Sequence, residues 1–128
     1  MIKEIREYKA LRANGHYALA VRRNNTICTS GQFPIDPETG KTVEGSFEDK
    51  VRQTLSNIEA FIKELGGDKK DIVKVSVILP DLELWERFDK EYGKFFTGNY
   101  PARTVMIAKE LHFGHLLEVD AIAEIEEE

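Results

Sequence analysis

The chain has 128 residues, of which 41% are hydrophobic and 32% are charged. This length and composition are typical of a single globular domain, and they exclude disordered and fibrous proteins. No apolar run approaches the roughly 20 residues that a membrane-spanning helix needs.

The net charge of −5 lies mostly at the C-terminus, where four of the last five residues are glutamates, and the rest of the chain carries −1. We find no basic patch of the kind that nucleic-acid-binding proteins present. The single cysteine, Cys28, excludes an internal disulfide and fits a reducing compartment. The first ten residues contain no apolar signal-peptide segment. We therefore expect one cytoplasmic domain, residues 1–128, that acts on a small molecule.

The first part of the chain predicts three short strands, at residues 2–8, 16–22 and 26–30. Asn24-Asn25 separates the last two and favours a tight hairpin, because asparagine tolerates a positive φ. A polar loop follows at residues 34–40, where two prolines and a terminal glycine exclude a regular element.

The clearest predicted element is a helix that begins after Ser46. This serine stands three residues before Asp49, an arrangement that resembles a capping box. Five apolar residues then recur at intervals of four and three, which places them on one face of a helix. They are Val51, Leu55, Ile58, Ile62 and Leu65. Gly66-Gly67 is expected to end the helix.

The second half of the chain predicts one more helix between strands. Residues 72–79 form an apolar, β-branched run that predicts a central strand ending at Pro80. The second helix follows and ends before Gly98. Its apolar stripe consists of Trp85, Phe88, Tyr92 and Phe95. Two closing strands are expected at residues 102–108 and 116–125.

The predicted element order is therefore β-β-β-α-β-α-β-β. Each helix has a single apolar stripe, so we expect both to pack on one face of a mixed sheet. This arrangement is an α+β fold, a single two-layer domain. No third helix is predicted to cover the other sheet face, which favours a symmetric homo-oligomer that buries it.

Arg103 begins a predicted strand directly after the turn at Pro101. Strand alternation places Arg103, Val105 and Ile107 on one face. A surface position or a structural ion pair would explain this arginine. The alternative is bidentate binding of a carboxylate, for which a planar guanidinium is well suited. The spacing leaves both interpretations open.

In the last predicted strand, alternation places Glu118 and Asp120 on the face opposite to that of Leu117 and Val119. The simpler interpretation is an edge strand with solvated acids. The alternative makes one of these acids a general base that orients a water molecule near Arg103.

Three further features allow both a chemical and a structural interpretation. His112 and His115 share a loop but have no acidic or cysteine partner at motif spacing, so we expect no metal site. Cys28 lies in an apolar strand, and we expect a buried small hydrophobic residue rather than a nucleophile. Gly31 ends a strand; it allows close approach of the backbone to a ligand, or it belongs to a simple bulge or turn.

Several short segments stand in a characteristic order and spacing that covers nearly the whole chain. They are Gly15-His16-Tyr17, Ser30-Gly31-Gln32 with Pro34, Asp36-Pro37 with Thr39-Gly40, Gln53-Thr54-Leu55 with Asn57-Ile58, Pro101-Ala102-Arg103, and residues 117–123. Together they resemble the RidA (YjgF-type) family of reactive-intermediate deaminases.

The resemblance implies a chorismate-mutase-like α+β fold and a homotrimer with three sites at subunit interfaces. It also implies hydrolysis of 2-imino acids such as 2-iminobutanoate and 2-iminopropanoate to 2-oxo acids and ammonia, without cofactor or metal. Arg103 would then bind the substrate carboxylate and Glu118 would hold the attacking water. The side chains of Tyr17 and Ser30 would shape the pocket. Backbone groups near Gly31 and Val105 would contact the substrate.

Two other functions remain open at this stage. One is a non-enzymatic regulatory trimer in which the same arginine binds a small carboxylate without turnover. The other is an RNA-directed translation inhibitor, which the acidic net charge disfavours.

Overall fold

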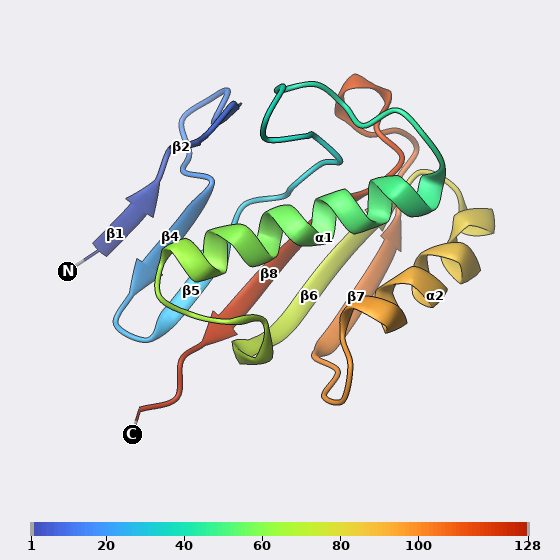
Figure 1. Ribbon diagram of the computed structural model, residues 1–128. Coiled ribbons are helices and arrows are strands. Elements are labelled where there is room, and N and C mark those ends of the chain that lie inside the picture. The colour runs from blue at the N-terminus through green and yellow to red at the C-terminus, as the bar shows by residue number, and fades with distance from the viewer. Residues whose placement is uncertain (1, 128) are drawn as a thin grey trace.

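The computed structural model describes residues 2–127. Its main strands are β1 (Ile2–Ile5), β4 (Ala20–Arg23), β5 (Thr26–Thr29), β6 (Ile72–Leu79), β7 (Ala102–Ile107) and β8 (Glu118–Glu124). They form one sheet in the order β1-β4-β5-β8-β6-β7 (Figure 1). β6 and β7 run parallel, and the other neighbouring strands are antiparallel.

Two helices, α1 (Phe47–Glu64) and α2 (Trp85–Phe95), lie side by side across one face of this sheet (Figure 1). The predicted α+β fold, with two helices on one face of a mixed sheet, is confirmed. Neither helix combines the length and the apolar character needed to cross a membrane.

The N-terminal region differs from the prediction in its number of strands. The first predicted strand is interrupted at Arg6, and β2 (Glu7–Tyr8) pairs instead with β3 (Leu11–Arg12) in a separate two-stranded ribbon. A turn at Lys9, where φ is 53°, reverses the chain between them. The second predicted strand begins at Ala20 and not at residue 16, so three strands precede α1 in the main sheet and two lie outside it. The hairpin between β4 and β5 is confirmed, with Asn24 at a φ of 53°.

Helix α1 begins and packs as its sequence predicts. The Ser46 hydroxyl accepts a hydrogen bond from the Asp49 N–H at 3.1 Å, and the Asp49 carboxylate accepts one from the Ser46 N–H at 3.0 Å. Such a cap is worth about 1 kcal/mol. All five residues of the predicted stripe are buried, including Leu65 just after the helix. The chain then turns at Gly66, whose φ of 93° favours glycine.

Helix α2 keeps only part of its predicted stripe. Phe88 and Tyr92 are buried, but Trp85 is 36% exposed. Trp85 is the first residue of the helix, where it lies beside the guanidinium of Arg103. Phe96, one residue beyond the helix, is buried instead.

The acids of β8 do not lie on an edge strand, and that interpretation was wrong. β8 pairs with both β5 and β6 in the interior of the sheet. Glu118 and Asp120 are half-buried on the sheet face without helices, while Val119 between them is fully buried under the helices. An antiparallel sheet covered on one face leaves its other face to solvent, so an interior strand can carry acids.

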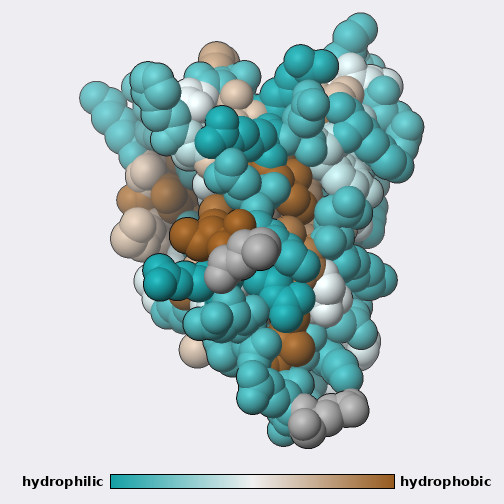
Figure 2. All heavy atoms as spheres, turned by 90° about the vertical axis from the view of Figure 1, so that its left-hand side faces the viewer, coloured by the Kyte–Doolittle hydropathy of each residue, from teal (hydrophilic) through white to brown (hydrophobic). Residues whose placement is uncertain are grey.

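Cys28 also lies on this open face, and the expectation that it is buried was wrong. Its neighbour Ile27 is fully buried toward the helices, so alternation turns Cys28 outward, where it is exposed. On the same face, Met106 and Ile122 are 56% and 38% exposed. The β1 side of the molecule also shows hydrophobic side chains gathered in its middle, with hydrophilic ones around them (Figure 2).

Candidate active site

A cavity of about 670 Å³ opens at the end of the sheet where β5 ends and β8 begins. The loop after β5 and the loop before β8 lie at this same end (Figure 1). Four of the six predicted site residues line the cavity: Tyr17, Ser30, Gly31 and Glu118. The other two, Arg103 and Val105, do not.

Gly31 packs directly against the carboxylate of Glu118. A Cβ at position 31 would lie 2.8 Å from the Glu118 carboxyl carbon and nearer still to Oε2. The backbone here is fixed, because Gln32 exchanges two hydrogen bonds with Val119, at 2.7 and 3.0 Å. The glycine therefore allows the backbone to approach the Glu118 side chain closely.

Ser30 and Tyr17 are held by backbone groups of the neighbouring segment. The Ser30 hydroxyl donates to the carbonyl of Ala18 at 2.6 Å, and the Ser30 N–H donates to the carbonyl of Leu19 at 2.9 Å. The Tyr17 hydroxyl accepts a hydrogen bond from the Asn14 N–H at 3.2 Å. The Ser30 oxygen keeps its lone pairs, so it can still accept a hydrogen bond from a ligand.

Glu118 is the acidic residue among the described residues that line the cavity. Burial raises the pKa of its carboxyl above the usual value; His112 partly opposes this effect, and the charge of Asp120 adds to it. Within residues 2–127, no hydrogen bond or ion pair to this carboxylate is found. A half-buried carboxylate with a raised pKa is a better proton acceptor than a solvated one, and such groups are typical of functional sites.

Arg103 lies on β7, under helix α2. Its Nη1 is 2.9 Å from Oδ1 of Asp89, so the structural ion pair considered from the sequence is present. The guanidinium also lies 4.6 Å from the ring centroid of Tyr92, and the rings of Trp85 and Phe88 are within 6 Å. These contacts hold the guanidinium in one orientation.

The hydroxyl of Tyr92, beneath Arg103, is buried without a hydrogen-bond partner within residues 2–127. Burial raises the pKa of Tyr92 to about 12, although the positive charge of Arg103 opposes the rise. The phenol is therefore neutral at every physiological pH, and Tyr92 places no negative charge next to Arg103.

Arg103 and Glu118 point to opposite faces of the sheet within one chain. Arg103 is in register with Val75, which is buried toward the helices. Glu118 is in register with Ile78, three residues along β6 and therefore on the other face. Val105 shares the face of Arg103. One chain thus brings together Tyr17, Ser30, Gly31 and Glu118, but not the arginine.

Sequence reasoning did not place Phe33, Phe113 or the two histidines in this cavity. His115 is 7% exposed and stacks on Phe33, with ring centroids 4.4 Å apart. The pair His112 and His115 drew attention only as possible metal ligands. Across residues 2–127 no group of three or more histidine, cysteine or acidic side chains gathers where a metal ion could bind. The sequence feature that could have indicated a binding site was a run of aromatic residues in a loop next to a glycine.

Comparison with known proteins shows to which family the chain belongs. The sequence pattern of the family described as endoribonuclease L-PSP matches residues 7–125. The chain belongs to this family. It is similar to a RutC family protein of Pyrococcus abyssi, 36% identical over 90% of this chain and 91% of the relative. It is also similar to the rat 2-iminobutanoate/2-iminopropanoate deaminase, 36% identical over 94% of this chain and 88% of the relative.

Among solved structures, RidA from an Antarctic Psychrobacter superposes with a TM-score of 0.89 at 34% identity, covering 96% of this chain and 99% of that one. The resemblance to the RidA (YjgF-type) family is therefore confirmed. The two chains share this fold over almost their whole lengths.

Proposed function

We propose that this protein hydrolyses 2-imino acids, and the enamines that interconvert with them, to 2-oxo acids and ammonia. The observation that carries the proposal is the Glu118 carboxylate, half-buried in a cavity that Ser30 and Gly31 also line, with no hydrogen bond or ion pair to it from residues 2–127. The names of deaminase relatives at 34–36% identity support the same reaction.

In this reaction Glu118 accepts a proton from a water molecule as that water adds to the imine carbon. The carbon–nitrogen double bond becomes a single bond, and the nitrogen takes up the proton that Glu118 accepted, which restores the carboxylate. The proton of the new hydroxyl then moves through Glu118 to the nitrogen as the carbon–nitrogen bond breaks, which leaves the 2-oxo acid and ammonia. A protonated imine is already electrophilic, so a carboxylate facing it both stabilises the positive charge and orients the water.

The remaining site residues bind and orient the substrate in this proposal. Ser30 and Tyr17 shape the pocket around the reacting carbon, and the backbone at Gly31 contacts it. The guanidinium of Arg103 binds the substrate carboxylate with its N–H groups that do not face Asp89, and the backbone of Val105 contacts the same substrate. No metal or cofactor takes part.

Because Arg103 and Glu118 point to opposite faces in one chain, we infer that each site is built from two copies of a homotrimer. Arg103 lies on an edge strand, β7, where a second copy can approach. The open sheet face, with Met106 and Ile122 exposed, supplies apolar area for that contact. The single free Cys28 supports a cytoplasmic location.

The test is an assay of imine hydrolysis, with imines produced from amino acids by an amino-acid oxidase and trapped chemically. We expect the wild-type protein to accelerate hydrolysis and Arg103→Ala to lose more than about a hundredfold in kcat/KM. Arg87→Ala is the matched control, because Arg87 also pairs with a carboxylate but does not line the cavity. Wild-type rates in Arg103→Ala would contradict the assigned role.

A mixing experiment tests the shared site. Arg103→Ala and Glu118→Gln are each expected to be inactive. Co-expressed in one cell, they form mixed trimers in which some interfaces combine an intact Arg103 with an intact Glu118. Activity well above that of either variant supports the shared site, and none above background contradicts it. Sedimentation measures the trimer in each sample.

Two other functions remain as alternatives. A regulatory trimer that binds small carboxylates would give heat on titration with 2-oxobutanoate but no imine hydrolysis. The family description, endoribonuclease, favours an RNA-directed activity such as inhibition of translation. Cleavage of RNA that disappears in Glu118→Gln would support that activity, although a net charge of −5 disfavours binding to a polyanion.

A further inference from the structure

The cavity is lined by one carboxylate and by several aromatic side chains. Gly31 lies against Glu118, where the proposed reaction takes place, and Ser30 lines the same cavity. The chain then runs on along the cavity wall through Phe33 to Ile35. Gln32 pairs antiparallel with Val119, so Phe33 lies beside Glu118 in this register, and Leu11 and Leu19 also line the cavity.

Three rings line the cavity, and we call Phe33, Phe113 and His115 the aromatic wall. Phe33 and His115 are stacked, with centroids 4.4 Å apart and an angle of 18° between their planes. Phe113 meets His115 edge to face, at 6.3 Å and 81°. Stacked and edge-to-face geometries are those in which aromatic rings attract one another, so the wall can accept a further ring.

Phe113 is the unusual member of the wall. It is 84% exposed, and its backbone lies in the left-handed region with a φ of 57° and a ψ of 23°. A large residue rarely adopts this conformation, and strained positions of this kind cluster at ligand-binding sites. Its ring gains little from the core, so its place at the mouth of the cavity points to contact with a bound molecule.

The aromatic wall carries no net charge at neutral pH. Burial lowers the pKa of His115 below its ordinary value, and the charge of Lys50 lowers it further, so the imidazole stays neutral. Arg12, which also lines the cavity, lies 3.7 Å from the carboxylate of Glu7. The aromatic wall is therefore suited to an uncharged side chain.

The size of the cavity agrees with a large ligand. Its volume in one chain, before a second copy adds Arg103, is about 670 Å³, which lies within the range that encloses drug-sized molecules. A three- or four-carbon imino acid would fill only a small part of this volume, whereas a substrate with a ring can also cover the aromatic wall while its imine lies at Glu118.

We propose that this cavity selects 2-imino acids whose side chain is aromatic. The inference rests on the proposed function: the imine lies at Glu118, and the side-chain ring packs against Phe33, His115 and Phe113. Ring-on-ring contact adds to the burial of apolar area, so an aromatic side chain gains more from this wall than an aliphatic one of similar size.

The test compares kcat/KM for imines derived from phenylalanine, leucine, alanine and glutamate, with the wild-type trimer. We expect the phenylalanine-derived imine to be preferred over the leucine-derived one by several-fold, and over the alanine-derived one by about tenfold or more. In Phe113→Ala the ratio of phenylalanine to alanine is expected to fall several-fold. Leu82→Ala is the matched control, because Leu82 is 68% exposed and does not line the cavity, and it should keep the wild-type ratio.

Equal or higher kcat/KM for the leucine- or alanine-derived imine would overturn the aromatic preference and leave the deaminase proposal intact. A preference for the glutamate-derived imine would also overturn it, and would point to Arg12 as the group that binds the side chain. If no imine is hydrolysed, the proposed function fails, and titration with phenylpyruvate and pyruvate decides the subsite separately. Tighter binding of phenylpyruvate that weakens in Phe113→Ala supports it, and equal binding overturns it.

Discussion

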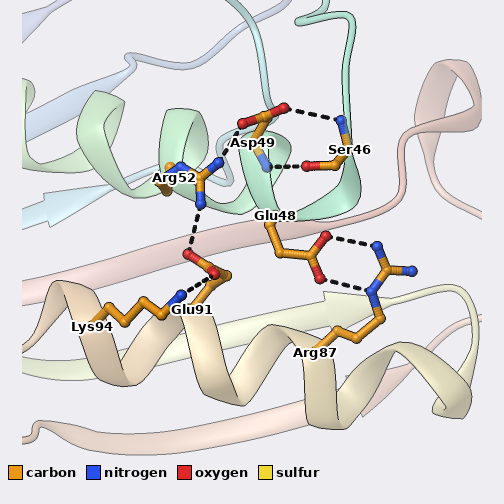
Figure 3. Close-up of polar contacts among 7 residues, drawn as sticks. All are labelled: Ser46, Glu48, Asp49, Arg52, Arg87, Glu91 and Lys94. Carbon is orange, nitrogen blue, oxygen red and sulfur yellow. Dashed lines mark hydrogen bonds and ion pairs between the residues drawn. The ribbon is translucent and has the colours of Figure 1, made fainter.

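The carboxylates between the two helices and those on β8 are held in opposite ways. Between the helices, Glu48 accepts two hydrogen bonds from Arg87, both of 2.7 Å (Figure 3). Buried Glu91 accepts one from Arg52 of α1 and one from Lys94 of its own helix, each of 2.8 Å. These bonds lower the pKa of Glu91, and they bring the pKa of Glu48 down to about 2.

On β8 the shift has the opposite direction, because burial raises the pKa of both Glu118 and Asp120. Lys74 partly offsets the rise for Asp120, whereas Glu118 has no bonded cation within the described residues. The helix pair uses its carboxylates to join two elements. The cavity keeps one in a state that destabilises the fold, which is the arrangement expected of a group retained for chemistry.

The largest expected effect comes from Glu118→Gln, which keeps the size of the side chain and removes its charge. We expect kcat for imine hydrolysis to fall by about 10²–10⁴, the contribution typical of a general base. The thermal midpoint should stay unchanged or rise, because an uncharged amide is less costly to bury. Asp120→Asn is the control, since Asp120 lies on the same face of β8 but outside the cavity lining. Full activity in Glu118→Gln would show that the Glu118 carboxylate is not retained for chemistry.

Gly31→Ala tests the position of the same carboxylate without changing its charge. The new Cβ would force the Glu118 carboxyl away from the backbone. A displacement of about 1 Å can cost up to a hundredfold in rate, so we expect kcat/KM to fall about ten- to a hundredfold. Gly93→Ala, in α2, is the matched control, because a Cβ there meets nothing within 4 Å. If both alanine variants keep full activity, the close approach has no catalytic importance.

Much of the fold could be predicted because its signals are local. The cap at Ser46 and the apolar spacing of α1 each depend on residues within a few positions of one another, and the run at residues 72–79 gave β6 its bounds. Alternation within β8 correctly separated Glu118 from Val119.

The site could be predicted only in part, because it depends on which strands pair. Alternation gives two faces for β7 and two for β8, but only their shared neighbour β6 shows that Arg103 and Glu118 lie on opposite ones. The same limit explains the error about the edge strand: acids on a strand indicate a face that water reaches, not a position in the sheet. The aromatic wall joins Phe33 to His115 across 82 positions of the chain, a contact that no local pattern carries.

A smaller effect on stability is expected from Glu91→Gln. The Glu91 side chain is 4% exposed and bonded to Arg52 and Lys94 through different oxygens, so an amide keeps one acceptor, loses the other hydrogen bond and removes the charge. We expect the free energy of unfolding, measured with urea, to fall by about 1–3 kcal/mol while imine hydrolysis is unchanged. Glu86→Gln, at an exposed position of the same helix, should leave both unchanged. Loss of activity in folded Glu91→Gln would show that the two regions are not independent.

The smallest effect is a change in how stability depends on pH. The direction of this change tests the comparison between the paired and the unpaired carboxylates. The pKa of Glu48 is about 2 in the folded protein and 4.5 without its partner, so its stabilisation is present above pH 4.5 and is lost as the pH falls toward 2. Glu118 behaves in reverse: its raised pKa means that its penalty is absent at low pH and appears as the pH rises through the folded value. We expect the stability difference between wild type and Glu48→Gln to grow with pH, and that between wild type and Glu118→Gln to change in the opposite direction. Thermal melts from pH 2 to 7 measure the stability difference for each variant as a function of pH. If the two differences change with pH in the same direction, the paired carboxylate Glu48 and the unpaired carboxylate Glu118 do not differ as their surroundings indicate.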